Sequence, residues 1–304
     1  MRIFEHRKRS LIYHLRTLWL FTRSDLKTVV FPQTAFGYSA AFLRGTNTIS
    51  LSSLFTNIPW HLPRIVFWIW LNLLGEVIAN QRLSNSIIED SINKPWRPLP
   101  SKRLTPDEAR NLLLWILPVT YLVGRVIGGS EASVALMVLS YMYNDLGGAN
   151  ESWLVRNVLN ACGLSSFSIG AAQVAAGPLS PLEDCLYMWV TILAVIITST
   201  VQLQDLPDAE GDRARDRRTL QLVYGEKVAR WSIAMPMLFW SLFCPCYWGL
   251  SVLGFLPSCL LGGLIATRVI FSRSRAADAL TWKLWCLWMM VLYLLPLLYT
   301  VRKI

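Results

Sequence analysis

Three aspartates follow the apolar run MWVTILAVIITSTV, in the segment QDLPDAEGDRARDRRTL. Asp205, Asp208 and Asp212 are separated by three and four residues, so a helix would present all three carboxylates on one face. Like charges this close repel one another unless cations neutralise them. Carboxylate oxygens suit Mg²⁺, which keeps several waters and is commonly shared between protein carboxylates and the phosphates of a substrate. The pattern predicts a magnesium site. The alternative is a solvated helix end paired with the basic residues Arg213, Arg217 and Arg218.

A second acidic segment, NQRLSNSIIEDSINKPWRPLPSKRL, ends another apolar stretch earlier in the chain. Asn85 and Glu89 lie four residues apart and Asp90 is adjacent, so two or three oxygen ligands would face inward from one helix. Two oxygen-rich helix ends that come together can hold metal ions between them. The candidate metal ligands and catalytic residues are therefore Asn85, Glu89, Asp90, Asp205, Asp208 and Asp212.

Basic side chains follow both acidic segments. Arginine suits bidentate contact with phosphate oxygens, and lysine supplies a compact positive charge. Such side chains would neutralise the oxygens of a diphosphate that face away from the metal. The candidates are Lys94, Arg97, Arg213, Arg217 and Arg218. Lys94 and Arg97 also have a topological explanation, because positive residues gather in the cytoplasmic loops of membrane proteins.

A third polar segment, SYMYNDLGGANESW, follows a further apolar stretch. Tyr143, Asn144 and Asp145 would face the same opening as the two acidic segments. The Asn144 amide or the Asp145 carboxylate would then orient the diphosphate or a water bound to the metal. The alternative is that Asp145 only starts the Gly-Gly turn that follows, since aspartate favours turns.

The composition indicates which kind of protein carries these segments. The chain has 304 residues, of which 54% are hydrophobic and 16% charged, and its mean hydropathy is +0.40. These values are too apolar for an ordinary soluble domain of this length, so we expect an integral membrane protein. A spanning helix needs about 20 mostly apolar residues. The sequence predicts an all-α bundle of nine spans, approximately at 26–44, 64–82, 111–127, 131–143, 155–176, 185–204, 229–248, 249–270 and 282–301.

The distribution of lysine and arginine predicts the orientation of the chain in the membrane. If the basic residues near the start are cytoplasmic, the connections after the second, fourth, sixth and eighth spans lie on the same side. These connections carry most of the remaining positive charges, whereas the opposite loops GTNTISLSSLFTNIPWHLP and GPLSPLED hold none. The asymmetry predicts a cytoplasmic N-terminus and places both acidic segments at the cytoplasmic face.

The remaining features define the domains and exclude one class of partner. His14, Arg16 and Arg23 interrupt the apolar residues near the start, so no signal-peptide core is present and residues 1–25 are expected to form a basic amphipathic segment on the membrane surface. Residues 26–304 would form a single domain. The net charge of +10 is spread over several loops, which argues against a nucleic-acid partner. The six cysteines lie in or beside apolar spans and are expected to be packing residues.

The two acidic segments and their flanks resemble a known family. The pairing of INKPWRPLPS after the first segment with DLPDAEGDRARDRRTL in the second is similar to the UbiA superfamily of intramembrane prenyltransferases, from about residue 30 to the C-terminus. The resemblance implies nine transmembrane helices around a central cavity, in which two aspartate-rich motifs bind an isoprenyl diphosphate through Mg²⁺. The second motif matches in full, which assigns metal and diphosphate binding to Asp205, Asp208 and Asp212.

The first motif departs from the pattern of the superfamily. Anchored on INKP, that pattern places its last aspartate at Asp90, its middle aspartate at Ser86 and its asparagine at Arg82. Serine does not replace a carboxylate, so Glu89, with Asn85 beside it, would supply the missing charge. The altered form is similar to a fungal branch that includes membrane-bound terpene cyclases. This resemblance implies an endoplasmic reticulum membrane.

An enzyme of this kind ionises an allylic diphosphate. Metals and cations stabilise the departing diphosphate, and a carbocation is left in the cavity. Aromatic rings attract such a cation and exclude water, although aromatic residues also form belts at the membrane interface. The candidates in or beside the predicted spans are Trp68, Trp70, Tyr141, Tyr143, Trp231, Trp240, Trp282, Trp285 and Trp288.

Three functions are consistent with these observations. The resemblance favours a terpene cyclase that acts on farnesyl or geranylgeranyl diphosphate, in which a double bond of the substrate captures the cation. A prenyltransferase would instead deliver the cation to an aromatic or quinone-precursor acceptor. A non-catalytic protein whose basic loops bind anionic lipid is the third hypothesis, but it does not explain carboxylates clustered on two helix ends.

Overall fold

The structure is a computed structural model that describes residues 9–43 and 58–302, and the regular elements in these ranges are helical. The longer helices are α1 (Leu11–Thr22), α2 (Phe31–Ala41), α4 (Ile58–Gln81), α6 (Pro106–Ile127), α7 (Ser130–Asn144), α9 (Trp153–Ala176), α10 (Asp184–Thr200), α13 (Glu226–Tyr247), α14 (Val252–Phe271) and α15 (Arg275–Arg302). The shorter elements are η1 (Leu26–Val30), α5 (Ser84–Asn93), α8 (Gly148–Glu151), η2 (Val201–Gln204), α11 (Asp205–Ala214) and α12 (Leu220–Tyr224). Residues 1–8 of the expected N-terminal segment and most of the loop expected after the first span lie outside the described residues.

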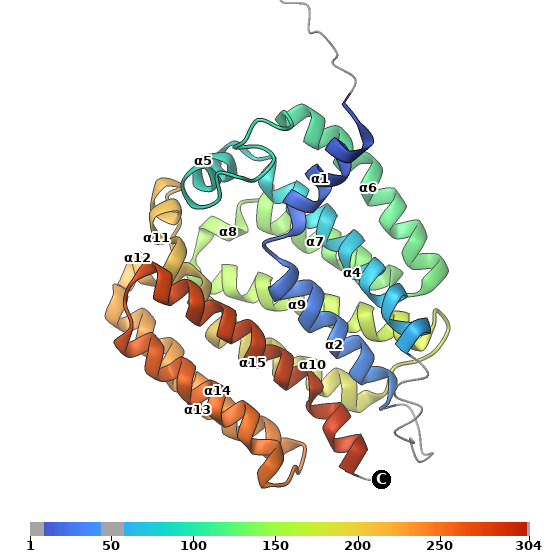
Figure 1. Ribbon diagram of the computed structural model, residues 1–304, viewed down its shortest axis with the longest axis vertical. Coiled ribbons are helices and arrows are strands. Elements are labelled where there is room, and N and C mark those ends of the chain that lie inside the picture. Colours follow the sequence, from blue (N-terminus) through green and yellow to red (C-terminus); the bar gives the residue numbers. More distant parts are fainter. Residues whose placement is uncertain (1–8, 44–57, 303–304) are drawn as a thin grey trace, which may run out of the picture.

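The long helices from α2 onward pack in a ring that follows the order of the chain. Each of α2, α4, α6, α7, α9, α10, α13, α14 and α15 contacts the next, and α15 returns to contact α2. Figure 1 shows α15 running between α2 and the α13–α14 pair. Helix α9 also contacts α2 and α4, so it fills part of the interior of the ring.

Local sequence signals determine where several of these helices begin and end. Helix α6 starts at a capping box, in which Thr105 and Glu108 satisfy each other's backbone N–H groups. It ends at Gly128, and Gly129 follows it; both have a positive φ, which glycine adopts without strain. Ser152 caps the first turn of α9 by accepting a hydrogen bond from the Val155 N–H.

Six helical stretches of the described residues are long and apolar enough to cross a membrane. They lie in α4, α6, α9, α10 with its continuation through α11, α14 and α15. Three other predicted spans do not meet these criteria: α2 has 11 residues, α7 has 15, and α13 is long enough but not apolar enough. The all-helical fold is confirmed, whereas the count of nine spans stays a prediction.

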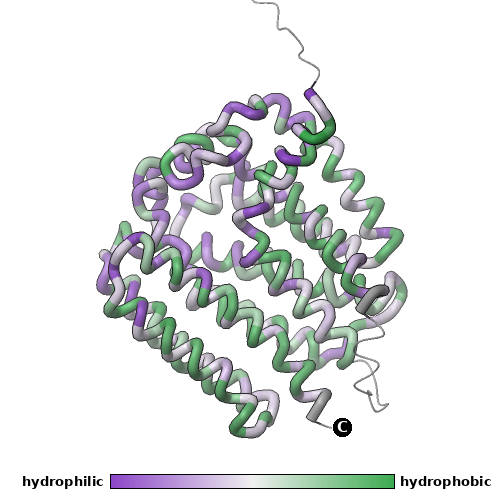
Figure 2. Tube along the Cα trace, viewed as in Figure 1, coloured by the Kyte–Doolittle hydropathy of each residue, from purple (hydrophilic) through white to green (hydrophobic). Residues whose placement is uncertain are grey.

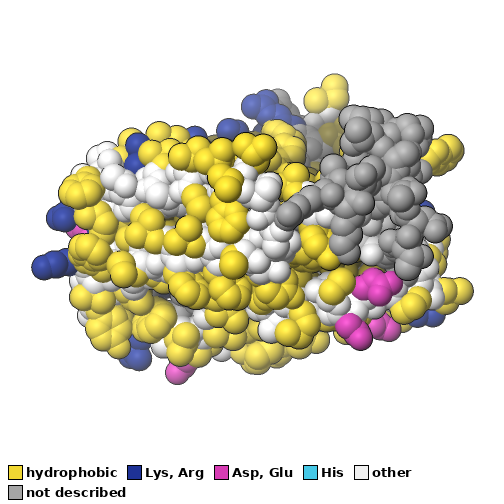
Figure 3. Space-filling view, turned by 90° about the horizontal axis from the view of Figure 1, so that it is seen from below, with side chains coloured by type: hydrophobic (Ala, Val, Ile, Leu, Met, Phe, Trp, Pro, Cys, Tyr) yellow, Lys and Arg dark blue, Asp and Glu magenta, His cyan; other side chains and the backbone are white. Residues whose placement is uncertain are grey.

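The outer surface of the bundle is apolar, as expected for helices that face lipid. Trp115, Leu122 and Val126 of α6 are each more than half exposed. Figure 3 shows that the described surface seen from below is mainly hydrophobic, with charged side chains mostly near its edges. Soluble monomers rarely expose apolar surface on this scale, so the exposed side chains support a membrane environment.

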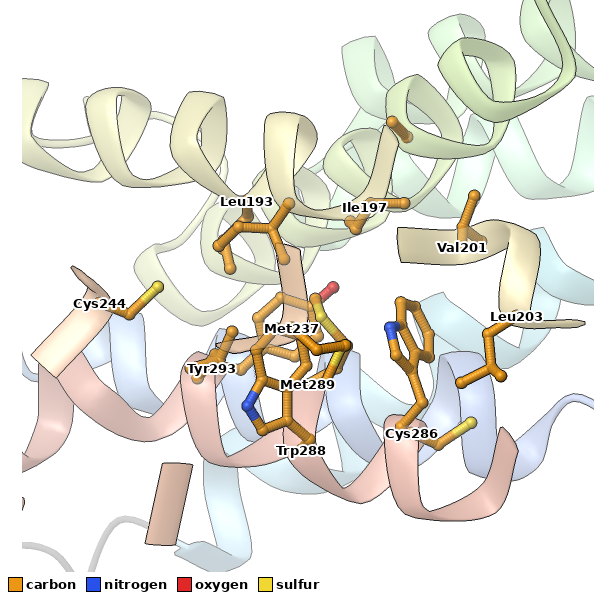
Figure 4. Close-up of a cluster of buried hydrophobic side chains, with 14 of the residues drawn as sticks. Leu193, Ile197, Val201, Leu203, Met237, Cys244, Cys286, Trp288, Met289 and Tyr293 are labelled. Atoms are coloured by element: carbon orange, nitrogen blue, oxygen red, sulfur yellow. The ribbon is translucent and has the colours of Figure 1, made fainter. Parts of the chain in front are cut away.

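Two hydrophobic clusters stabilise the interior. The first joins α10, α13, α14 and α15, and Figure 4 shows Leu193 and Ile197 of α10 facing Trp288 and Tyr293 of α15. The second joins α4, α6, α7 and α9. In this second cluster Gly170 lies so close to the Trp68 ring that a Cβ atom would be 2.0 Å from it. These packed walls hold the polar end of the bundle in place.

Candidate functional site

Helices α5 and α11 lie side by side and carry the two acidic segments. Figure 2 shows hydrophilic residues gathered around this end of the molecule, whereas the long helices are mostly hydrophobic. Asn93, the last residue of α5, donates from Nδ2 to the carbonyl oxygen of Asp208 at 3.2 Å. Its Oδ1 accepts a hydrogen bond from Arg275 Nη2 at 2.9 Å. The structure thus brings together the two segments that were expected to meet.

Gly211 allows α11 to approach α5 this closely. A Cβ atom at this position would lie 2.1 Å from Asn93 Nδ2. We expect Gly211→Ala to displace the Asn93 side chain, break its bond to Asp208 and lower kcat/KM about tenfold, or about 1.4 kcal/mol. Gly263→Ala is the matched control, because a Cβ atom there meets nothing within 4 Å. An unchanged kcat/KM for Gly211→Ala would show that the close approach does not matter for the reaction.

Glu89 lies between two buried arginines. Arg215 Nη1 donates to Glu89 Oε2 at 2.9 Å and also to the Ser86 hydroxyl at 2.9 Å. Arg217 Nη1 donates to Glu89 Oε1 at 2.9 Å and to Asp212 Oδ1 at 2.8 Å, which connects the two acidic segments. Burial disfavours the charged form of Glu89, but the two guanidinium groups outweigh it and hold the pKa of Glu89 below its usual range. Glu89 is therefore a carboxylate at neutral pH.

Asp90 pairs with Arg97 on the other side of the site. Arg97 Nη1 donates to the two Asp90 carboxylate oxygens at 2.8 and 3.0 Å. Its Nη2 donates to Ser24 Oγ at 3.0 Å and lies 3.6 Å from Asp25 Oδ2. Burial raises the pKa of Asp90 above its ordinary value, and Arg97 offsets this only in part.

The three aspartates of the second segment each have a basic partner. Arg156, near the start of α9, forms a buried ion pair with Asp205. Lys94 Nζ lies 3.5 Å from Asp208 Oδ2, and Arg217 holds Asp212 as described. Asp212 Oδ2 is buried without a hydrogen-bond partner among the described residues.

Three of the expected site residues lie outside this cluster. Asn85 is exposed on α5, because the chain turns between α4 and α5 and the inward face of α5 is formed by Ser86, Glu89 and Asp90. Arg213 and Arg218 are also exposed, and their side chains make no hydrogen bond within the described part of the chain. The arginines that contact the acidic side chains are instead Arg215, which was not predicted, and Arg217, which was.

A central cavity of about 250 Å³ opens beside these residues. Its wall includes five side chains that have a buried N–H group without a partner among the described residues: Arg97, Arg156, Asn160, Gln204 and Arg217. Unpaired buried donors are costly, and a site rich in them is suited to an anion with several acceptor oxygens. The deeper wall is apolar and includes Leu73, Val77 and Phe167.

The candidate asparagine and two aromatic candidates also reach the central cavity. Asn144 lines it and accepts a hydrogen bond from Asn80 Nδ2 at 2.7 Å, whereas the neighbouring Asp145 pairs with Arg82. Tyr143 and Trp282 line the cavity as well. Trp282 stacks on Trp285, with ring centroids 4.7 Å apart and an interplanar angle of 12°. The cavity therefore combines a polar mouth with π faces.

The donor chemistry fits Mg²⁺ and a diphosphate. The acidic side chains at the mouth offer oxygen ligands, and the buried Asp212 Oδ2 has no other partner. In the described residues no three acidic, histidine or cysteine side chains converge closely enough to hold a metal, and the carboxylates are paired with arginines. Asp205, Asp208 and Asp212, with Glu89 and Asp90, stay the predicted ligands of the ion.

Sequence reasoning missed three residues that the structure places at the site. The site predicted from the sequence does not include Arg156, although a single charged residue on a helix long and apolar enough to span a membrane is itself a signal. The prediction named Arg213, Arg217 and Arg218 but not Arg215, which pairs with Glu89. Asn80 lies in the NQ pair that ends α4, and its contact with Asn144 could not be read from the sequence.

Comparisons with known proteins agree with this geometry. Residues 34–298 match the UbiA prenyltransferase family. A somaliensene A/B synthase from Streptomyces somaliensis is 30% identical over 310 residues, which cover 97% of this chain and 96% of the synthase. A fumagillin beta-trans-bergamotene synthase from Aspergillus fumigatus is 28% identical over 237 residues, which cover 78% of this chain and 76% of that protein.

The fold is shared with solved structures. A UbiA homolog from Archaeoglobus fulgidus, whose structure contains DMAPP and Mg²⁺, matches with a TM-score of 0.62 at 10% identity, over 95% of this chain and 100% of the homolog. At this identity the likeness shows the fold alone. The resemblance inferred from the two acidic segments is confirmed by the family match, which spans most of the sequence. The chain therefore belongs to the UbiA prenyltransferase family.

Proposed function

We propose that this enzyme is a membrane-embedded terpene cyclase that uses Mg²⁺ and acts on farnesyl or geranylgeranyl diphosphate. The observation that carries the ionisation step is the group of unpaired N–H donors in the wall of a cavity that also has apolar side chains. The choice of cyclisation is supported by the two relatives named as terpene synthases. It is also supported by the altered first motif, in which Ser86 stands where the superfamily has an aspartate.

The basic side chains at the mouth bind the diphosphate and stabilise its charge. Arg97, Arg156 and Arg217 line the cavity, and each has a buried Nε–H group without a partner among the described residues; Lys94 adds a positive charge next to Asp208. When the C–O bond of the allylic diphosphate breaks, its electron pair stays on the departing oxygen, where these cations stabilise it. Bound Mg²⁺ would act there as a Lewis acid on the same oxygens. Asn144 orients the diphosphate from α7.

The cavity below the mouth protects the carbocation. Tyr143, Phe167 and Trp282 supply π faces that attract a cation, and the aliphatic side chains between them exclude water. A substrate folded against these walls presents its own distal double bonds to the cationic carbon. The shape of the walls then selects which ring closes.

A second cavity supports the runner-up, prenyl transfer to an acceptor. This side pocket of about 240 Å³ lies between α4, α6 and α7 and shares Glu76 and Ser140 with the central cavity. Asn72, Thr120 and the Arg82–Asp145 pair give it polar groups that an aromatic or quinone-precursor acceptor could contact. The two functions differ in one measurable property, because only the transferase needs an acceptor.

The proposed orientation places the N-terminus and the mouth of the cavity on the cytoplasmic side, in an endoplasmic reticulum membrane. It is supported by exposed basic residues near the mouth, among them Arg213, Arg218 and Arg275. We further propose that α1 lies on the membrane surface as part of the amphipathic segment 1–25. Its exposed Leu11, Ile12 and Leu15 would then enter the lipid.

The function is tested by incubating the purified protein in detergent with Mg²⁺ and either farnesyl or geranylgeranyl diphosphate, without an acceptor. We expect mass spectrometry of the organic extract to show a cyclic hydrocarbon or terpene alcohol. Its amount should fall to background when EDTA removes the metal. No cyclic product from either substrate, followed by prenylation once an aromatic acceptor is added, would contradict the cyclase proposal and establish the transferase.

A further inference from the structure

Glu76 is an acidic residue on a membrane-spanning helix, and the chemistry proposed above does not use it. It lies five residues before the end of α4, which corresponds to about 7 Å along the helix axis. Asn72 and Asn80 lie one turn before and one turn after it on the same face. Acidic side chains at membrane depth are costly, and their presence is best explained by a function.

The contacts of these three residues differ. Asn72 Nδ2 donates to the Trp68 carbonyl at 2.9 Å, and Asn80 Nδ2 donates to Asn144 Oδ1 at 2.7 Å. Glu76 makes no hydrogen bond or ion pair with any residue that the structure describes, and the charged group that acts on it most directly is Asp25, which has the same sign. No cation therefore neutralises the Glu76 carboxylate, in contrast to the carboxylates at the mouth.

Glu76 lies where two cavities meet. It lines the central cavity together with Asn80, Val77 and Leu73, and it also lines the side pocket. A half-buried acid without partners on a membrane-spanning helix lowers the stability of the fold, so a purely structural role does not account for it. Its free oxygens face the space in which the carbocation would form, below the residues that bind the diphosphate.

We propose that Glu76 is the base that ends the cyclisation. This inference rests on the proposed cyclase function. In the last step, a C–H bond next to the cationic carbon breaks and its electron pair becomes the new C=C bond. The proton moves to the Glu76 carboxylate, while the diphosphate keeps the electron pair of the C–O bond broken earlier. The products are a neutral hydrocarbon, diphosphate and protonated Glu76, so charges and atoms balance.

Two features of the cavity support Glu76 as the acceptor over the departed diphosphate. The diphosphate is held at the mouth, where its oxygens are engaged by the N–H donors of Arg97, Arg156 and Arg217. Glu76 is deeper, beside the apolar wall where the hydrocarbon chain lies.

The test compares Glu76→Gln with Glu76→Asp in the full chain, given Mg²⁺ and the diphosphate that the wild type cyclises. Release of diphosphate measures ionisation, and mass spectrometry measures the products. We expect Glu76→Gln to release diphosphate within about threefold of the wild-type rate, which also shows that it is folded. Its yield of the wild-type hydrocarbon should fall at least about tenfold, in favour of alcohols or acyclic products, since general bases contribute at least this much. Glu76→Asp should restore part of the hydrocarbon.

The matched control is Glu131→Gln, which alters an exposed glutamate in the first turn of α7. It should keep both the rate and the product profile. A Glu76→Gln enzyme with the wild-type profile would overturn the role of Glu76 and leave the cyclase proposal intact. A wild type that forms no hydrocarbon without an acceptor would overturn the cyclase proposal and the role of Glu76 with it.

Discussion

Replacement of Asp205 and Asp208 together by alanine is expected to abolish diphosphate release, with a rate at least about a thousandfold below that of the wild type. This corresponds to about 4 kcal/mol, a typical scale for losing a metal that stabilises a leaving group. The change removes two of the oxygen ligands at the mouth. It also leaves Arg156 and Lys94 without the carboxylates they now contact. The measurement is diphosphate release at saturating Mg²⁺, with product analysis alongside.

Glu210→Ala is the control for this experiment. Glu210 lies on the same helix, but it is exposed, and its one ion pair among the described residues is with the exposed Arg275, at 3.1 Å. Exposed pairs contribute little, so its rate should stay within about twofold of the wild type. Full activity in the Asp205→Ala/Asp208→Ala enzyme would end the assignment of a metal site to the second acidic segment.

Arg156→Ala should impair both activity and stability. Arg156 and Asp205 are nearly fully buried, so removal of the arginine leaves an uncompensated carboxylate. Breaking a buried ion pair in this way costs about 3 kcal/mol or more, which should lower Tm by at least about 5 °C. The arginine is also one of the donors for the diphosphate, so we expect turnover to fall at least about a hundredfold.

A second substitution separates the two effects. In Arg156→Ala/Asp205→Asn the buried charge is removed along with its partner, so Tm should recover toward the wild-type value while activity stays lost. Arg213→Ala, which changes an exposed arginine of the same region, should leave both properties unchanged. If the double variant is no more stable than Arg156→Ala, the ion pair does not stabilise the fold as described.

The helices and the meeting of the two acidic segments could be predicted from the sequence, because apolar stretches and charge asymmetry determine which helix ends lie together. The sequence did not predict which residues of α5 point toward the site. Asn85 and Glu89 lie four apart on one unbroken helix, but the buried face of α5 is centred on Ser86, Glu89 and Asp90, and Asn85 lies at its edge. As a result Ser86 faces Arg215, and Asn85 faces outward.

The arginines after α11 show a second limit. The helix ends at Ala214, and Asp216 has a φ of +56°, in the left-handed region. This turns the chain back, so that the Arg217 N–H donates to the Asp212 carbonyl at 3.0 Å and its side chain reaches Glu89. A left-handed aspartate is uncommon and cannot be identified from its neighbours in sequence. The choice of Arg217 over Arg218 follows from this turn, whereas Arg215 precedes it and lies three residues after Asp212, on the same face of the helix.

The contact between the first and last helices of the ring has a consequence for biosynthesis. Gln33 Nε2 donates to Tyr293 Oη at 3.2 Å, and the Leu297 N–H donates to Ser39 Oγ at 3.0 Å, across more than 250 residues of chain. During translation α2 leaves the ribosome long before α15 exists, so these bonds form only after the whole chain is made. The ring stays open until then, and a nascent chain that stalls before α15 has an incomplete cavity wall. Catalytic competence thus arises with the final helix.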